Sequence, residues 1–340
     1  MLTNQTIMYL QQSKYTTFLQ IAGLLFIIWG ILGLMDAKNY SYSGYSTDNN
    51  TVIEVKEGTP AEAAGMQVGD VMKSYDGISM TDSKAFSKRQ RTEIGQTIEI
   101  VVDRSGEEQT LQVVYSALPD ENSTLNMMSF VTGLLFVLLG LYVNFKKKTA
   151  LTLAFAVYGV FFGFAFFNGP HINSGILNTL TGSISITIIM FAFVSLARFI
   201  LQYPKQSSFL KGGNSRWIYA PAAIIVTTMW LLNFVKPDST SALNTGVDML
   251  FFAVIIFYFG LSFITLIRKY SQANSEERQS LGLNYMLFGA ALGILPFLIY
   301  FIINQVSPAT ILPGNEYIYL TFAAIPVFFS LALMKKSTAA

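Results

Sequence analysis

The stretch Glu57-Gly-Thr-Pro-Ala-Glu-Ala-Ala-Gly-Met-Gln-Val-Gly-Asp70 is the most informative segment of this chain, and the dipeptide Asp76-Gly77 follows it closely. Glycine, proline and aspartate at such spacings mark tight turns between short regular elements. Pro60 can begin a short helix and Gly65 can end it, because proline fits the first helical turn and glycine accepts the left-handed backbone after the last. The segment therefore predicts a small, water-soluble domain that is rich in turns.

Strands and helices are predicted on both sides of this segment. Strands are expected at 51–55, 71–75, 97–103 and 110–115, from β-branched runs and from alternation of apolar and polar residues. In the third strand, for example, Ile98, Ile100 and Val102 share one face. A short helix is expected at 60–64 and a second over about 83–91, where Asp82 can cap the helix N-terminus.

This order of motifs resembles a PDZ domain in the arrangement found in bacterial secreted proteases. In that family, a helix and an edge strand form a groove that takes a peptide C-terminus by strand addition. The resemblance implies that a carboxylate-binding loop precedes the first core strand and that the second helix faces it. The alternative is a docking or dimerising module whose groove binds no peptide. The motifs that carry the resemblance are Gly58-Thr-Pro-Ala61, Ala64-Gly65-Met66, Gly69-Asp70, Asp76-Gly77 and Gly95. The peptide-binding residues that the resemblance implies are Tyr42, Ser43, Gly44 and Tyr45 in the loop and Ser83, Phe86, Ser87 and Gln90 in the helix.

The rest of the chain has the composition of a membrane protein. Of its 340 residues 52% are hydrophobic and only 12% are charged, against about 25% charged residues in a typical soluble domain. A spanning helix needs about 20 mainly apolar residues, and eight stretches qualify. They lie at about 17–35, 126–144, 149–168, 177–199, 217–235, 247–267, 282–303 and 317–335.

Lysine and arginine gather in alternate loops, which predicts the orientation of the helices. Cytoplasmic loops carry the excess of these residues, so the N-terminus, the C-terminus and the basic loops are expected in the cytoplasm. The PDZ-like domain then lies outside the cell membrane. One side receives Lys14, Lys146, Lys147, Lys148, Arg198, Lys205, Lys211, Arg216, Arg268, Lys269, Arg278, Lys335 and Lys336, and the other short loops hold only Lys236.

The expected fold class is mostly α, an eight-helix transmembrane bundle (1+7) with an inserted α+β PDZ-like extracytoplasmic domain. We expect a tail and first helix at 1–36, the PDZ-like domain at 37–118, and seven spanning helices with a short tail at 119–340.

This architecture resembles the sensor half of multi-pass bacterial histidine kinases, which has one span, an external PDZ-like domain and seven further spans. That resemblance implies a sensor module without its kinase. The segments 275–280, 285–297 and 319–329 carry it.

Residue types that support catalysis are scarce. The chain has no cysteine and a single histidine, His171. A zinc protease of the membrane needs the pattern H-E-x-x-H, and a Ser-His-Asp triad needs a histidine within a catalytic domain. We therefore expect no enzymatic activity, no cofactor and no metal. His171 is expected to be an ordinary loop residue, with a pH-responsive contact to the PDZ-like domain as the alternative.

Three functional hypotheses remain open. The first is a sensor or receptor that binds a peptide or a protein C-terminus outside and signals to a cytoplasmic kinase or regulator. The second is a membrane-anchored scaffold or protease adaptor, and the third a transporter. Contact with membrane lipid is expected, and binding of nucleic acid is not.

Close helix packing is expected at Gly159-x-x-x-Gly163 and Gly289-x-x-x-Gly293. These contacts could form within one bundle or between the two chains of a homodimer.

Overall fold

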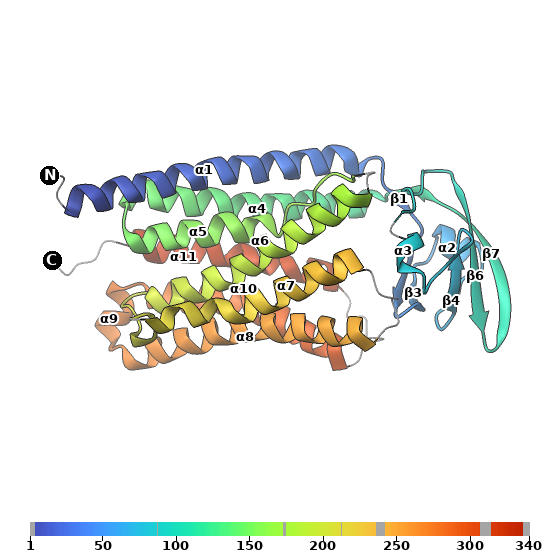
Figure 1. Cartoon of the computed structure of the whole chain (residues 1–340). Coiled ribbons are helices and arrows are strands. Elements are labelled where there is room, and N and C mark those ends of the chain that lie inside the picture. Colours follow the sequence, from blue (N-terminus) through green and yellow to red (C-terminus); the bar gives the residue numbers. More distant parts are fainter. Residues whose placement is uncertain are drawn as a thin grey trace.

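The computed structural model describes residues 4–86, 88–172, 175–211, 213–235, 242–306 and 314–335. Long helices form a bundle, and a domain that is rich in strands lies at one end of it (Figure 1). The chain enters this domain from the first helix and returns to the bundle through the fourth. Both chain termini lie at the other end of the bundle (Figure 1).

The bundle consists of eight apolar helices and short connecting helices. Helix α4 packs against α5, α5 against α6, and α1 lies across α4 and α5. The eight are α1 (Asn4–Ala37), α4 (Asp120–Lys147), α5 (Ala150–Phe164), α6 (Gly175–Gln202), α7 (Ala220–Val235), α8 (Ala242–Gln272), α10 (Leu283–Val306) and α11 (Ala324–Met334). The connecting elements are η1 (Ser208–Leu210), η2 (Gly213–Tyr219), α9 (Ser275–Ser280) and η3 (Asn315–Ala323).

Seven helical segments in the described part of the chain are long and apolar enough to cross a membrane. The chain is therefore a multi-pass membrane protein. The expected span at 149–168 is the shorter apolar helix α5. This helix has 15 residues and is about 22 Å long, less than the roughly 30 Å of a bilayer core. Turns replace the helix after Phe164, before Gly169 and Pro170.

Glycines let α4 and α5 approach each other closely. A Cβ added at Gly159 would lie 2.6 Å from the carbonyl oxygen of Phe136, and one at Gly163 would lie 2.8 Å from that of Gly133. A Cβ at Gly293 would meet Ile325 at 2.4 Å. The small-residue spacings of the sequence therefore serve packing inside one bundle. Stacked and edge-to-face phenylalanines fill the core around them, among them Phe136, Phe162, Phe193, Phe259 and Phe322.

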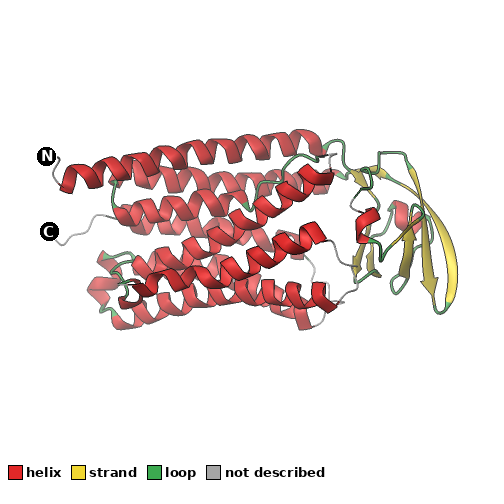
Figure 2. Ribbon diagram, in the orientation of Figure 1, coloured by secondary structure: helices red, strands yellow, loops and turns green. Residues whose placement is uncertain are grey.

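The inserted domain is built on a twisted antiparallel sheet (Figure 2). The strand order is β2-β3-β4-β6-β7, so β2 lies at one edge of the sheet, and β5 pairs with β4. Strands β1 and β8 form a separate two-stranded sheet. The strands are β1 (Ser41–Tyr42), β2 (Tyr45–Asp48), β3 (Thr51–Val55), β4 (Val71–Tyr75), β5 (Ile78–Ser79), β6 (Thr97–Arg104), β7 (Glu107–Val114) and β8 (Ser116–Ala117), and the helices are α2 (Pro60–Ala63) and α3 (Ser83–Phe86).

Alternation in the strands places one face of the sheet in the domain core. Ile98, Ile100 and Val102 of β6 are fully buried, and Val113 of β7 and Val52 of β3 join them. The mostly helical fold class with an inserted β-rich domain is thus confirmed. The second helix is shorter than the predicted 83–91, because i to i+3 turns replace it after Phe86. Asp82 caps it as expected, with a carboxylate oxygen 2.9 Å from the N–H of Ala85.

Candidate functional site

A groove of about 620 Å³ opens in the inserted domain beside the edge strand β2. Side chains from β2, from β4 and from the segment that follows α3 form its walls, and the loop between α5 and α6 closes one side with His171. We call this cavity the β2–α3 groove. It is lined by Tyr40, Ser41, Tyr45, Thr47, Met72, Tyr75, Met80, Phe86, Arg89, Gln90, Arg91, Thr92, Tyr115 and His171.

Strand β2 presents an open backbone edge to this groove. In the sheet it pairs with β3 and has no second neighbour among the described strands. The carbonyl oxygen of Gly44 accepts a hydrogen bond of 2.8 Å from the N–H of Lys56. Because successive residues of an antiparallel strand point their polar groups to opposite sides, the N–H and C=O of Tyr45 face the open edge. An extended peptide laid along β2 would find these groups ready for strand addition.

The floor of the groove is a chain of side-chain hydrogen bonds. The guanidinium of Arg89 donates to the hydroxyl of Thr92 at 2.7 Å, and that hydroxyl lies 2.9 Å from the hydroxyl of Tyr75. Tyr75 in turn donates to the hydroxyl of Tyr115 at 2.9 Å. Burial raises the pKa of Tyr45, Tyr75 and Tyr115 above the ordinary phenol value. These phenols therefore stay neutral and can hydrogen-bond a ligand at any physiological pH.

Two arginines give the groove its positive charge. Its lining holds Arg89 and Arg91 and contains no aspartate or glutamate, while Asp36, outside the lining, pairs with Arg91. Aromatic rings hold both guanidinium groups in place: Arg89 lies 4.5 Å above the ring of Tyr75, and Arg91 lies 4.1 Å above the ring of Tyr40. Arg89, which forms no ion pair within the described residues, favours a ligand that carries a carboxylate.

The loop before β2 is held rigidly against the start of α2. The carbonyl oxygen of Ser43 accepts from the N–H of Ala61 at 2.9 Å, in addition to the bond between Gly44 and Lys56. Gly44 has a positive φ of 86°, and a Cβ added there would lie 2.2 Å from Thr59. A side chain at position 44 would therefore displace the loop, so glycine is required at this position.

A second set of contacts joins the groove to the helical bundle. Asp36, the penultimate residue of α1, accepts a hydrogen bond of 2.9 Å from the backbone N–H of His171 and lies 3.3 Å from the guanidinium of Arg91. The hydroxyl of Tyr40 donates to the carbonyl oxygen of Gly169 at 3.2 Å. Arg91 thus belongs to the wall of the groove and to the junction with the bundle at once.

The residues predicted from the sequence fall into three groups. Tyr45, Phe86 and Gln90 line the groove, whereas Tyr42, Ser43 and Gly44 lie in β1 and in the adjoining loop and Ser83 begins α3. Ser87 lies outside the described residues. The sequence analysis missed Arg89, Arg91, Thr92, Tyr75 and Tyr115 as site residues, although the two arginines within the expected helix at 83–91 were a signal for a charged wall.

Comparison with known proteins identifies the inserted domain. Residues 35–114 match the family model of the PDZ domain. The chain is also similar to the zinc metalloprotease RasP of Oceanobacillus iheyensis, with 28% identity over 140 residues. That match covers 41% of this chain and 28% of the length of the relative. The chain is thus a multi-pass membrane protein with a PDZ domain, which is the part of the resemblance that these matches support.

The similarity to RasP corrects one prediction. The expectation that this chain is not an enzyme is contradicted, because the matched relative is a zinc metalloprotease. Zinc in such proteins is held by clusters of histidine, cysteine and carboxylate side chains. Within the described ranges no group of three or more of these side chains lies close enough to hold a metal ion. No zinc ligand is therefore assigned to this part of the chain.

Proposed function

We propose that this protein captures extended peptides at the membrane surface in its β2–α3 groove and that the captured peptide is a substrate for membrane proteolysis. The observation that carries the proposal is the open edge of β2 beside a groove whose lining has no carboxylate and holds Arg89 in a fixed position, with Arg91 beside it paired to Asp36. PDZ domains bind peptides by adding a strand to such an edge. The similarity to the zinc metalloprotease RasP supports the link to proteolysis.

The peptide would pair with the backbone of Tyr45 and place its carboxylate near the guanidinium groups or in the loop Tyr42–Tyr45. Side chains of the peptide would enter the apolar part of the groove beside Met72, Met80 and Phe86. Main-chain pairing gives affinity for many sequences, and the pocket selects among them. A groove of this kind suits a receptor for unfolded or newly cut protein ends.

The test is peptide binding by the full-length protein in lipid nanodiscs, with a library of random C-terminal peptides as the probe. Tyr45→Pro removes the N–H at the open edge, whereas Tyr45→Val loses the same ring and keeps the N–H. We expect Tyr45→Val to bind selected peptides within a fewfold of the wild type and Tyr45→Pro to lose at least about tenfold. Mass spectrometry of the same samples records whether the peptide is cut. Equal binding by both variants would contradict strand addition.

A second function, signalling to a cytoplasmic partner, is favoured by the junction of Asp36, Arg91 and His171. These contacts place the groove wall and the first helix in one hydrogen-bonded unit. A peptide that engages Arg91 would compete with Asp36 for its guanidinium and so alter the docking of α1. Capture of cytoplasmic proteins from native membranes, with and without a selected peptide, tests this function. A kinase or regulator that is recovered in different amounts with and without the peptide would support this function. Equal recovery with and without the peptide would contradict it.

We further propose that the end of the bundle opposite the PDZ domain faces the cytoplasm. Lysines and arginines concentrate at that end, as the orientation rule requires. Because the natural sequence has no cysteine, single cysteines can report the orientation in intact cells. Glu107→Cys at the exposed start of β7 should react with a membrane-impermeant thiol reagent, and Ser275→Cys at the start of α9 should react only after the cells are opened. The reverse pattern would overturn this orientation.

A further inference from the structure

A second and larger cavity, of about 1060 Å³, lies in the bundle between α1, α5 and α6. Residues in the N-terminal half of α1 and in the C-terminal half of α6 line it, and these ends of the two helices lie away from the PDZ domain (Figure 1). We call it the α1–α6 pocket. Its lining comes from α1, α5 and α6, from the segment after α6 and from Tyr219 of η2. Nothing in the peptide-binding function uses this pocket.

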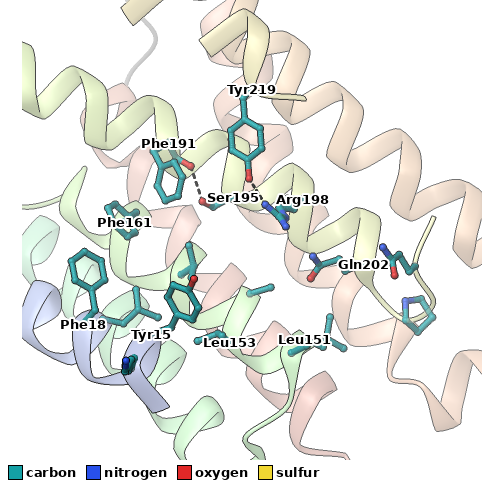
Figure 3. A pocket seen from close by; sticks show the side chains of 17 residues that line it. Tyr15, Phe18, Leu151, Leu153, Phe161, Phe191, Ser195, Arg198, Gln202 and Tyr219 are labelled. Atoms are coloured by element: carbon teal, nitrogen blue, oxygen red, sulfur yellow. Dashed lines mark hydrogen bonds between the residues drawn. The ribbon is translucent and has the colours of Figure 1, made fainter. Parts of the chain in front are cut away.

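The pocket has an apolar half and a basic half. Figure 3 shows Phe18, Phe161 and Phe191 together on one side and Arg198 with Gln202 on the other. Lys14 precedes Phe18 by one helical turn, and Arg198 follows Phe191 by seven residues, or about 10 Å along α6. Both cations therefore lie toward the helix ends, and the aromatic residues lie toward the middle of the bundle.

The basic half has no carboxylate to balance it. The lining contains Lys14 and Arg198 but no aspartate or glutamate. Arg198 is exposed although Ser195, Ala197 and Phe199 around it are buried. Its guanidinium donates to the hydroxyl of Tyr219, which orients the group along the pocket wall (Figure 3). Near the end of a membrane helix an arginine side chain reaches the interface, where an anionic group can bind it.

We propose that the α1–α6 pocket binds one anionic glycerophospholipid. The phosphate would lie between Lys14 and Arg198, and an acyl chain would follow Phe18, Leu153 and Phe161 toward the bilayer middle. Three observations agree on this class of ligand: the lining carries Lys14 and Arg198, the lining beyond them is apolar, and both cations lie toward the ends of apolar helical segments. Basic pockets between membrane helices bind anionic head groups in this manner. Arginine forms paired hydrogen bonds with phosphate oxygens, which adds to the attraction.

The test is native mass spectrometry of the full-length protein in detergent, titrated with dioleoyl phosphatidylglycerol and, separately, with dioleoyl phosphatidylcholine. We expect one phosphatidylglycerol per chain, bound more tightly than the zwitterionic lipid with the same acyl chains. Lys14→Gln and Arg198→Gln should each weaken phosphatidylglycerol about fivefold and leave phosphatidylcholine unchanged. Arg268→Gln is the matched control, because Arg268 is also exposed and also four residues before the end of its helix, yet outside the pocket.

Further variants and probes separate this ligand from other occupants. Ala154→Phe should fill the apolar half and weaken both lipids while the two cations remain, which tests the pocket even if Arg198→Gln fails to fold. Equal affinity for the two lipids, or the same loss in Arg268→Gln, would overturn the proposal. Displacement of the lipid by inorganic phosphate would assign a site for free phosphate instead. A dimer that Ala154→Phe dissociates, with lipid binding unchanged, would assign the pocket to a second copy of the chain.

Discussion

Asp36 in α1 accepts a hydrogen bond of 2.9 Å from the backbone N–H of His171 in the loop between α5 and α6. The same carboxylate lies 3.3 Å from Arg91 of the PDZ domain. One side chain thus joins the first helix, a loop of the bundle and the wall of the peptide groove.

Replacement of Asp36 by alanine should loosen this junction. In hydrogen exchange of the full-length protein, we expect faster exchange at the amide of His171 and across residues 89–92, with β6 and β7 unchanged. The physical reason is that the N–H of His171 and the guanidinium of Arg91 both lose their acceptor. Glu107→Ala, which removes an exposed carboxylate at the start of β7, is the control. Unchanged exchange at His171 would show that Asp36 does not hold the loop.

Gly33 sets how closely α1 approaches the same loop. A Cβ added at Gly33 would lie 1.7 Å from the carbonyl oxygen of Asn168, which is backbone and cannot rotate away. Gly33→Ala should therefore lower the free energy of unfolding by about 1–3 kcal/mol, as overpacking does. Gly182→Ala is the matched control, because no atom lies within 4 Å of its added Cβ. Thermal unfolding in detergent compares the two, and an equal melting temperature for both would refute the close approach.

Asp70 and Arg104 form a buried ion pair in the PDZ domain. Arg104 donates to both carboxylate oxygens of Asp70 at 2.7 Å, and the Asp70 side chain is only 1% exposed. The hydrogen bonds from Arg104 lower the pKa of Asp70 below the ordinary carboxyl value. Its stabilising effect is therefore complete above about pH 4 and is lost as the pH falls through the lowered pKa of the folded state.

Asp70→Asn should remove this acid sensitivity. We expect the variant to be less stable by about 2 kcal/mol at neutral pH and to lose less stability than the wild type between about pH 4 and pH 2. Hydrogen exchange of the core amides in β6 at several pH values provides the measurement. Lys73→Gln, which breaks the exposed pair with Asp103, should have a smaller effect. A parallel decline of both proteins with falling pH would argue against Asp70 as the titrating group.

Sequence patterns predicted the core elements of the PDZ domain because burial leaves a periodic signal. The runs Thr51–Val55 and Val71–Tyr75 coincide with β3 and β4. Strand β2 carries no such signal: after Tyr45 its residues Ser46, Thr47 and Asp48 are polar and exposed. An edge strand of this kind is defined by its neighbour β3 and not by its own composition.

The groove was predictable only in part, because its walls come from distant segments. Tyr45 and Phe86 followed from the PDZ resemblance, whereas Tyr115 lies just after β7 and His171 in a loop of the bundle. The approach of His171 to the groove depends on the docking of the domain on the helices. No local pattern encodes that docking, since it results from contacts such as the one between Tyr40 and Gly169.

Lys269 of α8 caps the end of α6. Its ammonium group lies 2.9 Å from the carbonyl oxygen of Ile200 and 3.0 Å from that of Leu201, which also accepts from the N–H of Ser207. Lys269→Met should lower the free energy of unfolding by about 1–2 kcal/mol, through the lost hydrogen bonds and the lost interaction with the helix dipole. Arg268→Met, at the adjacent exposed position, should change stability little. Denaturation in detergent tests the pair, and equal stability of the two variants would contradict the capping role.

Arg89 should decide whether the groove prefers a free peptide C-terminus. Its guanidinium is fixed by Thr92 and by the ring of Tyr75, so it is ready to meet a carboxylate without further ordering. For a peptide selected on the wild type, we expect amidation of the C-terminus to weaken binding about tenfold and Arg89→Gln to remove most of that difference. Lys88→Gln is the matched control, because Lys88 is adjacent and exposed but does not line the groove.

Fluorescence anisotropy measures the binding of the free and the amidated peptide to the wild type and to both variants. If Arg89→Gln kept the full preference for the free carboxylate, the loop Tyr42–Tyr45 would remain as the carboxylate-binding element, since its backbone is rigidly held by Lys56 and Ala61.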